Sequence, residues 1–197
     1  MSDFSVYLTI GLKHVLNVHA YDHVLFIMAL SVGYAFKDWK RLLWLVSVFT
    51  LGHTLALVLS VFGFVSVDVA LVEFCIPLTI MITAVAHFFN LKKTTGPPAF
   101  RTGIFVTLFF GLIHGLGFSN YFNALLPGSG SDKLLPLCSF AIGIELAQAS
   151  VVLSVLILSY IARTFLKWNQ RDIILVVSAF IIGVTLPMIL AADFWNQ

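Results

Sequence analysis

Charged residues are scarce in this chain: Asp, Glu, Lys and Arg make up 10% of its 197 residues, whereas 60% are hydrophobic. A soluble domain carries roughly 25% charged residues, so the scarcity excludes an ordinary soluble protein. Nearly all of the length divides into apolar segments and short connections. The composition therefore predicts one integral membrane domain that covers residues 1–197.

Other features are missing as well. The basic residues form no stripe outside short connections, which excludes a nucleic acid as a partner. The only two cysteines, Cys75 and Cys138, lie in apolar runs without the spacing of a disulfide framework. We interpret them as buried, small apolar side chains. The N-terminal residues contain no basic segment followed by a small-residue cleavage site, so we expect no removable signal peptide.

Apolar runs long enough to cross a bilayer, about 20 residues, recur along the chain. The predicted spans are Ala20–Phe36, Leu42–Phe62, Val65–Asn90, Thr102–Leu126, Leu134–Ala162 and Ile173–Ala192. The segment Phe4–Val18 is expected to be a separate interfacial or half-inserted piece. The predicted fold class is therefore all-α, a polytopic transmembrane helical bundle of about six spans.

The positive charges indicate how the bundle is oriented. Nine of the eleven basic residues fall in the first, third and fifth connections: Lys37, Lys40, Arg41, Lys92, Lys93, Arg101, Arg163, Lys167 and Arg171. Cytoplasmic connections of membrane proteins carry an excess of Lys and Arg. We therefore expect the odd-numbered connections to face the cytoplasm and both termini to lie outside.

The first predicted span opens with an unusual polar stretch, GLKHVLNVHAYDHVLF. In a helix, His19, Asp22 and His23 stand at positions i, i+3 and i+4 and share one face. Imidazole nitrogen and carboxylate oxygen are ligands that zinc, nickel and related divalent ions accept. The stretch predicts a metal site near the outer end of this span, to which His14 can also contribute.

Polar side chains also fall at a similar depth, in the outer half, of four other predicted spans. They are His53, Glu73, His114, Glu145 and Gln148. No Lys or Arg lies inside a predicted span to neutralise the carboxylates, and an unpaired carboxylate in hydrocarbon is costly. A bound cation is therefore favoured, and a hydrogen-bonded packing network is the alternative. In the inner half, His87 is the main comparable residue.

The order of these fragments is similar to one known family. GLKHVL and YDHVLF are followed by FTLGHTLAL, a Glu in the third span, FGLIHGLGF and FAIGIELAQ. This chain resembles the HupE/UreJ family, which is named for hydrogenase and urease accessory genes. The resemblance implies a polytopic membrane protein that handles nickel or cobalt, expected in the inner membrane of a bacterium.

The resemblance also implies which residues bind the metal: His14, Asp22, His23, His53, Glu73, His114, Glu145 and Gln148. The family usually reads H-x-x-x-G-x-D-H at the start. Here VLNVHA and Tyr21 separate His14 from Asp22, and His19 appears in the enlarged turn as an alternative ligand.

Three functions remain open at this stage. The first is transport of a divalent transition metal ion through the outer-half site. The second is an intramembrane zinc hydrolase, with the same ligands and Glu73 or Glu145 as general base. The third is a metal-stabilised scaffold or sensor. Nickel, cobalt and zinc all accept this ligand set. The lipid bilayer and the metal ion are expected partners, and a second copy of the chain or an accessory protein stays open.

Overall fold

The computed structural model describes residues 3–17, 21–90, 100–126 and 130–196, and all regular structure in these ranges is helical. Five described helices are long and apolar enough to cross a membrane. They are α3 (Trp39–Val61), α4 (Val69–Asn90), α5 (Phe100–Leu125), α6 (Leu134–Thr164) and α7 (Gln170–Leu190). Their ends lie within four residues of the predicted spans. The chain is an integral membrane protein built as a helical bundle.

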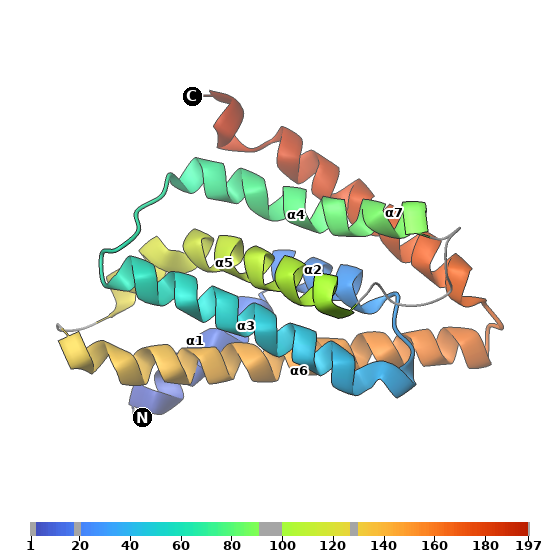
Figure 1. Cartoon of the computed structure of the whole chain (residues 1–197), viewed down its shortest axis with the longest axis horizontal. Coiled ribbons are helices and arrows are strands. Elements are labelled where there is room, and N and C mark those ends of the chain that lie inside the picture. The colour runs from blue at the N-terminus through green and yellow to red at the C-terminus, as the bar shows by residue number, and fades with distance from the viewer. Residues whose placement is uncertain (1–2, 18–20, 91–99, 127–129, 197) are drawn as a thin grey trace.

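The first predicted span differs from the structure. Ala20–Phe36 was expected to cross the membrane as one helix, but α2 covers only Asp22–Ser31. Ten helical residues extend about 15 Å, half of the hydrocarbon thickness. α1 (Asp3–Val15) precedes it, and the two short helices follow one another along the bundle as one broken crossing (Figure 1). The prediction that Ala20–Phe36 forms one full-length span is therefore wrong, because hydropathy does not register where a helix ends. α1 is a separate helix, as predicted for Phe4–Val18.

Side chains from other helices stabilise the C-terminal end of α2, where the helix stops sooner than predicted. His87 of α4 places Nε2 2.8 Å from the Ala29 carbonyl oxygen, and Gln170 of α7 donates to the Val32 carbonyl oxygen at 2.7 Å. The last carbonyl groups of a helix have no partner within the helix. These two side chains therefore supply hydrogen bonds that let α2 stop inside the bundle.

The long helices alternate in direction along the bundle axis (Figure 1). The start of α3, the end of α6 and the start of α7 gather at one end, together with Lys37, Arg163 and Arg171. The N- and C-terminal ends of the chain lie at the opposite end, which we call the outer end. These basic residues and the chain ends thus lie at opposite ends of the bundle, and the orientation in the membrane stays a prediction.

Glycines allow two pairs of helices to approach closely. A Cβ on Gly111 or Gly115 of α5 would collide with the backbone oxygens of Phe49 or His53 in α3. The two glycines stand four residues apart, the spacing at which small residues let two helices approach closely. Gly143 of α6 likewise lies directly against the backbone of α1. Lipid supplies little hydrophobic drive between helices, so such packing is a main source of stability.

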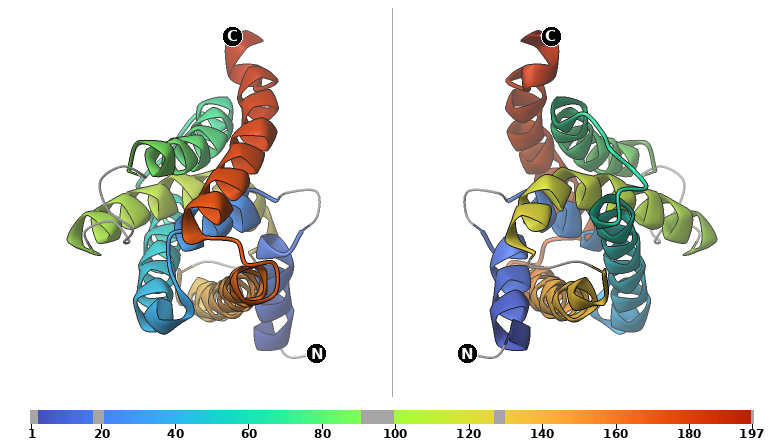
Figure 2. Two further views of the ribbon diagram at one scale, coloured as in Figure 1. Left: turned by 90° about the vertical axis from the view of Figure 1, so that its right-hand side faces the viewer. Right: turned by 90° about the vertical axis from the view of Figure 1, so that its left-hand side faces the viewer.

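The short helix α2 lies near the centre of the bundle when it is viewed from either end (Figure 2). α1 runs beside α6 on one side of it, α3 beside α5 on another, and α4 packs with α7. The start of α2 is therefore surrounded by residues from α1, α3 and α5. This position brings the polar residues of α1 and α2 close to those of α3 and α5.

Candidate metal centre

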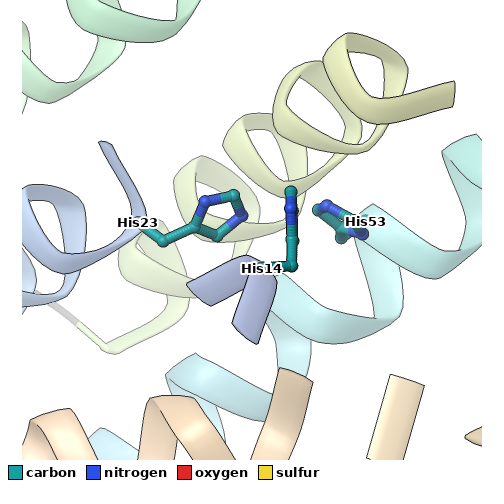
Figure 3. A group of neighbouring side chains, drawn as sticks. All are labelled: His14, His23 and His53. Atoms are coloured by element: carbon teal, nitrogen blue, oxygen red, sulfur yellow. The ribbon is translucent and has the colours of Figure 1, made fainter. Parts of the chain in front are cut away.

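Three histidines from three different helices meet beside the break between α1 and α2. His14 stands one residue before the end of α1, His23 is the second residue of α2, and His53 lies in the middle of α3. One potential ligand atom from each lies within 4.8 Å of the other two. The three rings face one another (Figure 3), and their centroids lie 4.6–5.6 Å apart. In the described part of the chain this is the one group of metal-ligating side chains so close together.

A fourth histidine completes the cluster. The ring centroid of His114, on α5, lies 5.3 Å from that of His23. His23, His53 and His114 are at most 2% exposed to solvent. We call His14, His23, His53 and His114 the histidine cluster.

Several ring nitrogens of this cluster are buried without a hydrogen-bond partner among the described residues. They are Nε2 of His14, Nε2 of His23, both nitrogens of His53 and Nε2 of His114. Leaving one buried polar group unsatisfied costs about 1–3 kcal/mol. A concentration of such groups at one point indicates a missing partner, and a metal ion accepts lone pairs from several imidazoles at once.

Two of the imidazoles are held in the orientation that metal binding requires. His23 Nδ1 lies 3.1 Å from Asp22 Oδ1, and His114 Nδ1 lies 2.9 Å from the Phe110 carbonyl oxygen. When Nδ1–H donates to these oxygens, the lone pair of Nε2 is free. Metal-binding histidines in proteins characteristically make such a bond with their second nitrogen. Asp22 therefore fixes the orientation of the His23 ring in this structure.

The glycine contacts explain how the cluster is positioned. Gly115 rests on the His53 carbonyl oxygen, which fixes the distance between the α3 and α5 backbones at the level of His53 and His114. Gly11 lies against α6 three residues before His14, so the end of α1 is fixed at a similar level. Backbone packing thus sets the spacing of the side chains.

A pocket of about 560 Å³ adjoins the cluster. Its polar lining includes Asp22, His14, His23 and His114, and Glu73 reaches it from α4. Glu73 is the fifth residue of α4, close to the outer end, and is exposed. The pocket therefore leads from the outer part of the bundle to the histidine cluster, with carboxylates at its side.

Glu145 and Gln148 are not brought into the cluster. Glu145 of α6 accepts hydrogen bonds from Ser47 Oγ and Thr50 Oγ1, both at 2.5 Å. Thr50 Oγ1 also lies 2.9 Å from Gln148 Oε1. We call these four residues the α3–α6 polar network. It lies next to the cluster, since Thr50 precedes His53 by one turn of α3.

The remaining expectations have separate outcomes. His19 lies outside the described residues. His87 is bonded to the Ala29 carbonyl oxygen and does not join the cluster. Cys75 and Cys138 are free cysteines, but Cys75 is only half-buried and Cys138 is exposed, so the expectation that both are buried is wrong.

Ser47, Thr50 and Lys13 face these sites although sequence reasoning did not select them. Ser47, Thr50 and His53 follow one another at three-residue intervals, which places them on one face of α3. That spacing could have identified the polar network. Lys13 lines the pocket beside His14, and the sequence offered no signal for it except its position next to a candidate ligand.

The cluster has the chemistry of a site for a first-row divalent ion. Imidazole nitrogens suit nickel, cobalt and zinc, and four imidazoles that each have a buried Nε2 without a hydrogen-bond partner among the described residues fit such an ion. Two nitrogens bound at about 2.1 Å to one ion are at most about 4.2 Å apart. Binding would therefore draw the rings slightly inward from their present spacing.

Comparison with known proteins identifies the chain's family. No curated protein and no solved structure matches the chain. The family described as HupE / UreJ protein matches residues 1–193. That match covers nearly the whole chain, and the protein therefore belongs to the HupE/UreJ family.

Proposed function

We propose that this protein captures a divalent transition metal ion, nickel or cobalt, at its outer end and carries it across the membrane. The histidine cluster would bind the ion, with Asp22 orienting His23 and Glu73 attracting the cation at the pocket wall. The family suggests an accessory role in nickel or cobalt transport. The ion is the substrate in this proposal.

One observation carries the proposal: the buried ring nitrogens of four histidines converge without hydrogen-bond partners among the described residues. Packing histidines would be expected to bond to backbone or side-chain oxygens, as His87 does. The cluster instead presents lone pairs to a common point beside a pocket. A metal cation, which accepts lone pairs from several nitrogens at once, matches that arrangement.

The α3–α6 polar network supports a direction of movement. Thr50 and Ser47 lie one and two turns from His53 toward the inner end of α3. Their hydroxyls and the Glu145 carboxylate provide oxygen atoms next along the helix. An ion leaving the cluster inward would first meet this network, which lowers the cost of entering the apolar interior.

Proteoliposomes test the proposal. Purified protein is reconstituted, nickel or cobalt is added outside, and a metal-sensitive dye is enclosed. We expect uptake by the wild type and none by His53→Ala. Absence of flux in the wild type, together with tight metal retention, would contradict transport.

A second function is favoured by one specific feature, the apolar inner part of the bundle. A cavity of about 390 Å³ between the inner parts of α3 and α6 is lined by apolar side chains, including Trp39, Leu43 and Leu156. A site that opens only outward suits an intramembrane hydrolase. His14, His23 and His53 would hold zinc, which would supply an activated water. Glu73 lines the same pocket and would serve as the general base.

The same reconstituted protein separates the two functions. A hydrolase predicts one tightly held zinc ion per chain, no ion flux, and loss of hydrolysis but retention of zinc in Glu73→Gln. A transporter predicts exchangeable metal and flux that depends on His53. Hydrolysis is measured with membrane-soluble ester and amide probes.

A further inference from the structure

The pocket beside the histidine cluster is larger than a hydrated metal ion needs. Its volume is about 560 Å³. Six water molecules around one ion occupy roughly 180 Å³, at about 30 Å³ each. About two thirds of the pocket would remain for another molecule.

The walls of the pocket are partly apolar, so water alone is a poor match for them. Ile10, Ile76, Phe118 and Tyr121 contribute to its lining. Phe118 lies with its ring centroid 3.9 Å from that of His14, so an apolar wall directly adjoins the cluster. Pockets that bind small molecules combine apolar walls with a few placed polar groups.

Two opposite charges face this pocket from different helices. Lys13 reaches it from α1 and Glu73 from α4, and both side chains are exposed. Within the described ranges neither of them forms an ion pair. The pocket thus offers an ammonium donor and a carboxylate acceptor to one bound molecule.

We propose that the metal enters this pocket as a complex with a small amino-carboxylate, a molecule that binds the ion through an amine nitrogen and a carboxylate oxygen. The coordinated amine still carries N–H groups that can donate to Glu73. The second oxygen of its carboxylate can accept from Lys13. The apolar part of the molecule fits against Ile76 and Phe118. This inference rests on the proposed function, since it names the form in which the substrate is captured.

Release from the complex is a ligand exchange without redox change. The bonds from the ion to the amine nitrogen and carboxylate oxygen break, and bonds to imidazole nitrogens of the cluster form. The amino-carboxylate leaves with both electron pairs and takes a proton from water at its amine. Imidazoles that are already oriented, as His23 and His114 are, favour this exchange.

A double-label binding experiment tests the inference. Purified full-length protein receives radioactive nickel together with tritiated free L-histidine as the amino-carboxylate, or with labelled citrate, which lacks an amine. We expect the wild type to capture nickel and tritiated histidine together at early times, with far less citrate, and then to lose the histidine label before the nickel as the exchange proceeds. Lys13→Ala should bind the histidine complex about tenfold more weakly, yet bind nickel supplied as the hydrated ion like the wild type. Lys13→Arg should restore binding of the complex.

Lys133→Ala is the matched control, because Lys133 lies near the start of α6 and outside the pocket lining. It should bind both forms of nickel like the wild type. Nickel that is captured without tritiated histidine even at the earliest times, or a Lys13→Ala variant that binds the complex normally, would overturn the inference and leave the proposed function intact. If neither the wild type nor His53→Ala retains nickel, whether supplied as the hydrated ion or as the complex, both the inference and the proposed function are overturned.

Discussion

Two polar groups lie side by side in this apolar bundle, and they differ in how their hydrogen bonds are satisfied. In the histidine cluster, His53 has no partner for either ring nitrogen among the described residues. In the α3–α6 polar network, both oxygens of Glu145 accept hydrogen bonds, and Thr50 also contacts Gln148. Only the amide nitrogen of Gln148 lacks a partner in the described part of that network.

The difference separates a group of side chains whose hydrogen-bonding capacity is unused from one that the protein satisfies by itself. Buried polar groups are normally hydrogen-bonded, so exceptions require an explanation. For the cluster, the explanation we propose is a metal ion. The network instead holds its carboxylate with hydroxyl groups from the neighbouring helix. Metal affinity should therefore depend strongly on the cluster and weakly on the network.

The largest effect is expected when a histidine of the cluster is removed. His53→Ala and His114→Ala should each weaken nickel binding by more than about 100-fold, because even changes outside the ligand shell cost 10–100-fold. Both variants should stay folded, since alanine is a good helix former. Equilibrium dialysis with elemental analysis measures the affinity. His87→Ala is the control, since its ring bonds a backbone oxygen outside the cluster.

An intermediate effect is expected for Asp22→Asn. In this variant a neutral amide replaces the charged carboxylate that orients His23. Nickel affinity should therefore fall by about 10–100-fold. Stoichiometry should stay unchanged at high nickel concentration, which isothermal titration calorimetry can measure. An affinity equal to that of the wild type would mean that Asp22 does not orient the ligand.

The smallest effect on metal affinity is expected for Glu145→Gln. The change should lower the free energy of unfolding by about 1–3 kcal/mol, because it replaces a charged acceptor of two hydroxyl bonds. Nickel affinity should change by less than the tenfold that marks the weakest outer-shell effects. Denaturant titration and nickel binding on one sample measure both. A loss of affinity as large as that of His53→Ala would place Glu145 in the metal site and erase the contrast.

The topology could be predicted from the sequence because its signals are local. Length, hydropathy and basic residues such as Lys37 and Arg163 each depend on a short stretch of chain. The end of α2 at Ser31 could not be predicted in the same way. It depends on His87 and Gln170, which reach the α2 carbonyl groups from distant helices.

The candidate site was predicted in part. The residue types and their depth in the membrane predicted that His23, His53 and His114 are neighbours. The helical spacing predicted that Asp22 lies beside them. Sequence could not tell a ligand from a hydrogen-bonded carboxylate, so Glu145 was grouped with the histidines. That distinction depends on the α3–α6 contact, which places Ser47 and Thr50 against Glu145.

X-ray absorption at the nickel edge of the loaded protein tests the central claim most directly. The account predicts three or four imidazole nitrogens around the ion, at about 2.0–2.1 Å, and loss of one imidazole in His53→Ala. A shell of oxygen atoms without imidazole scattering would contradict it, because the ion would then lie outside the histidine cluster.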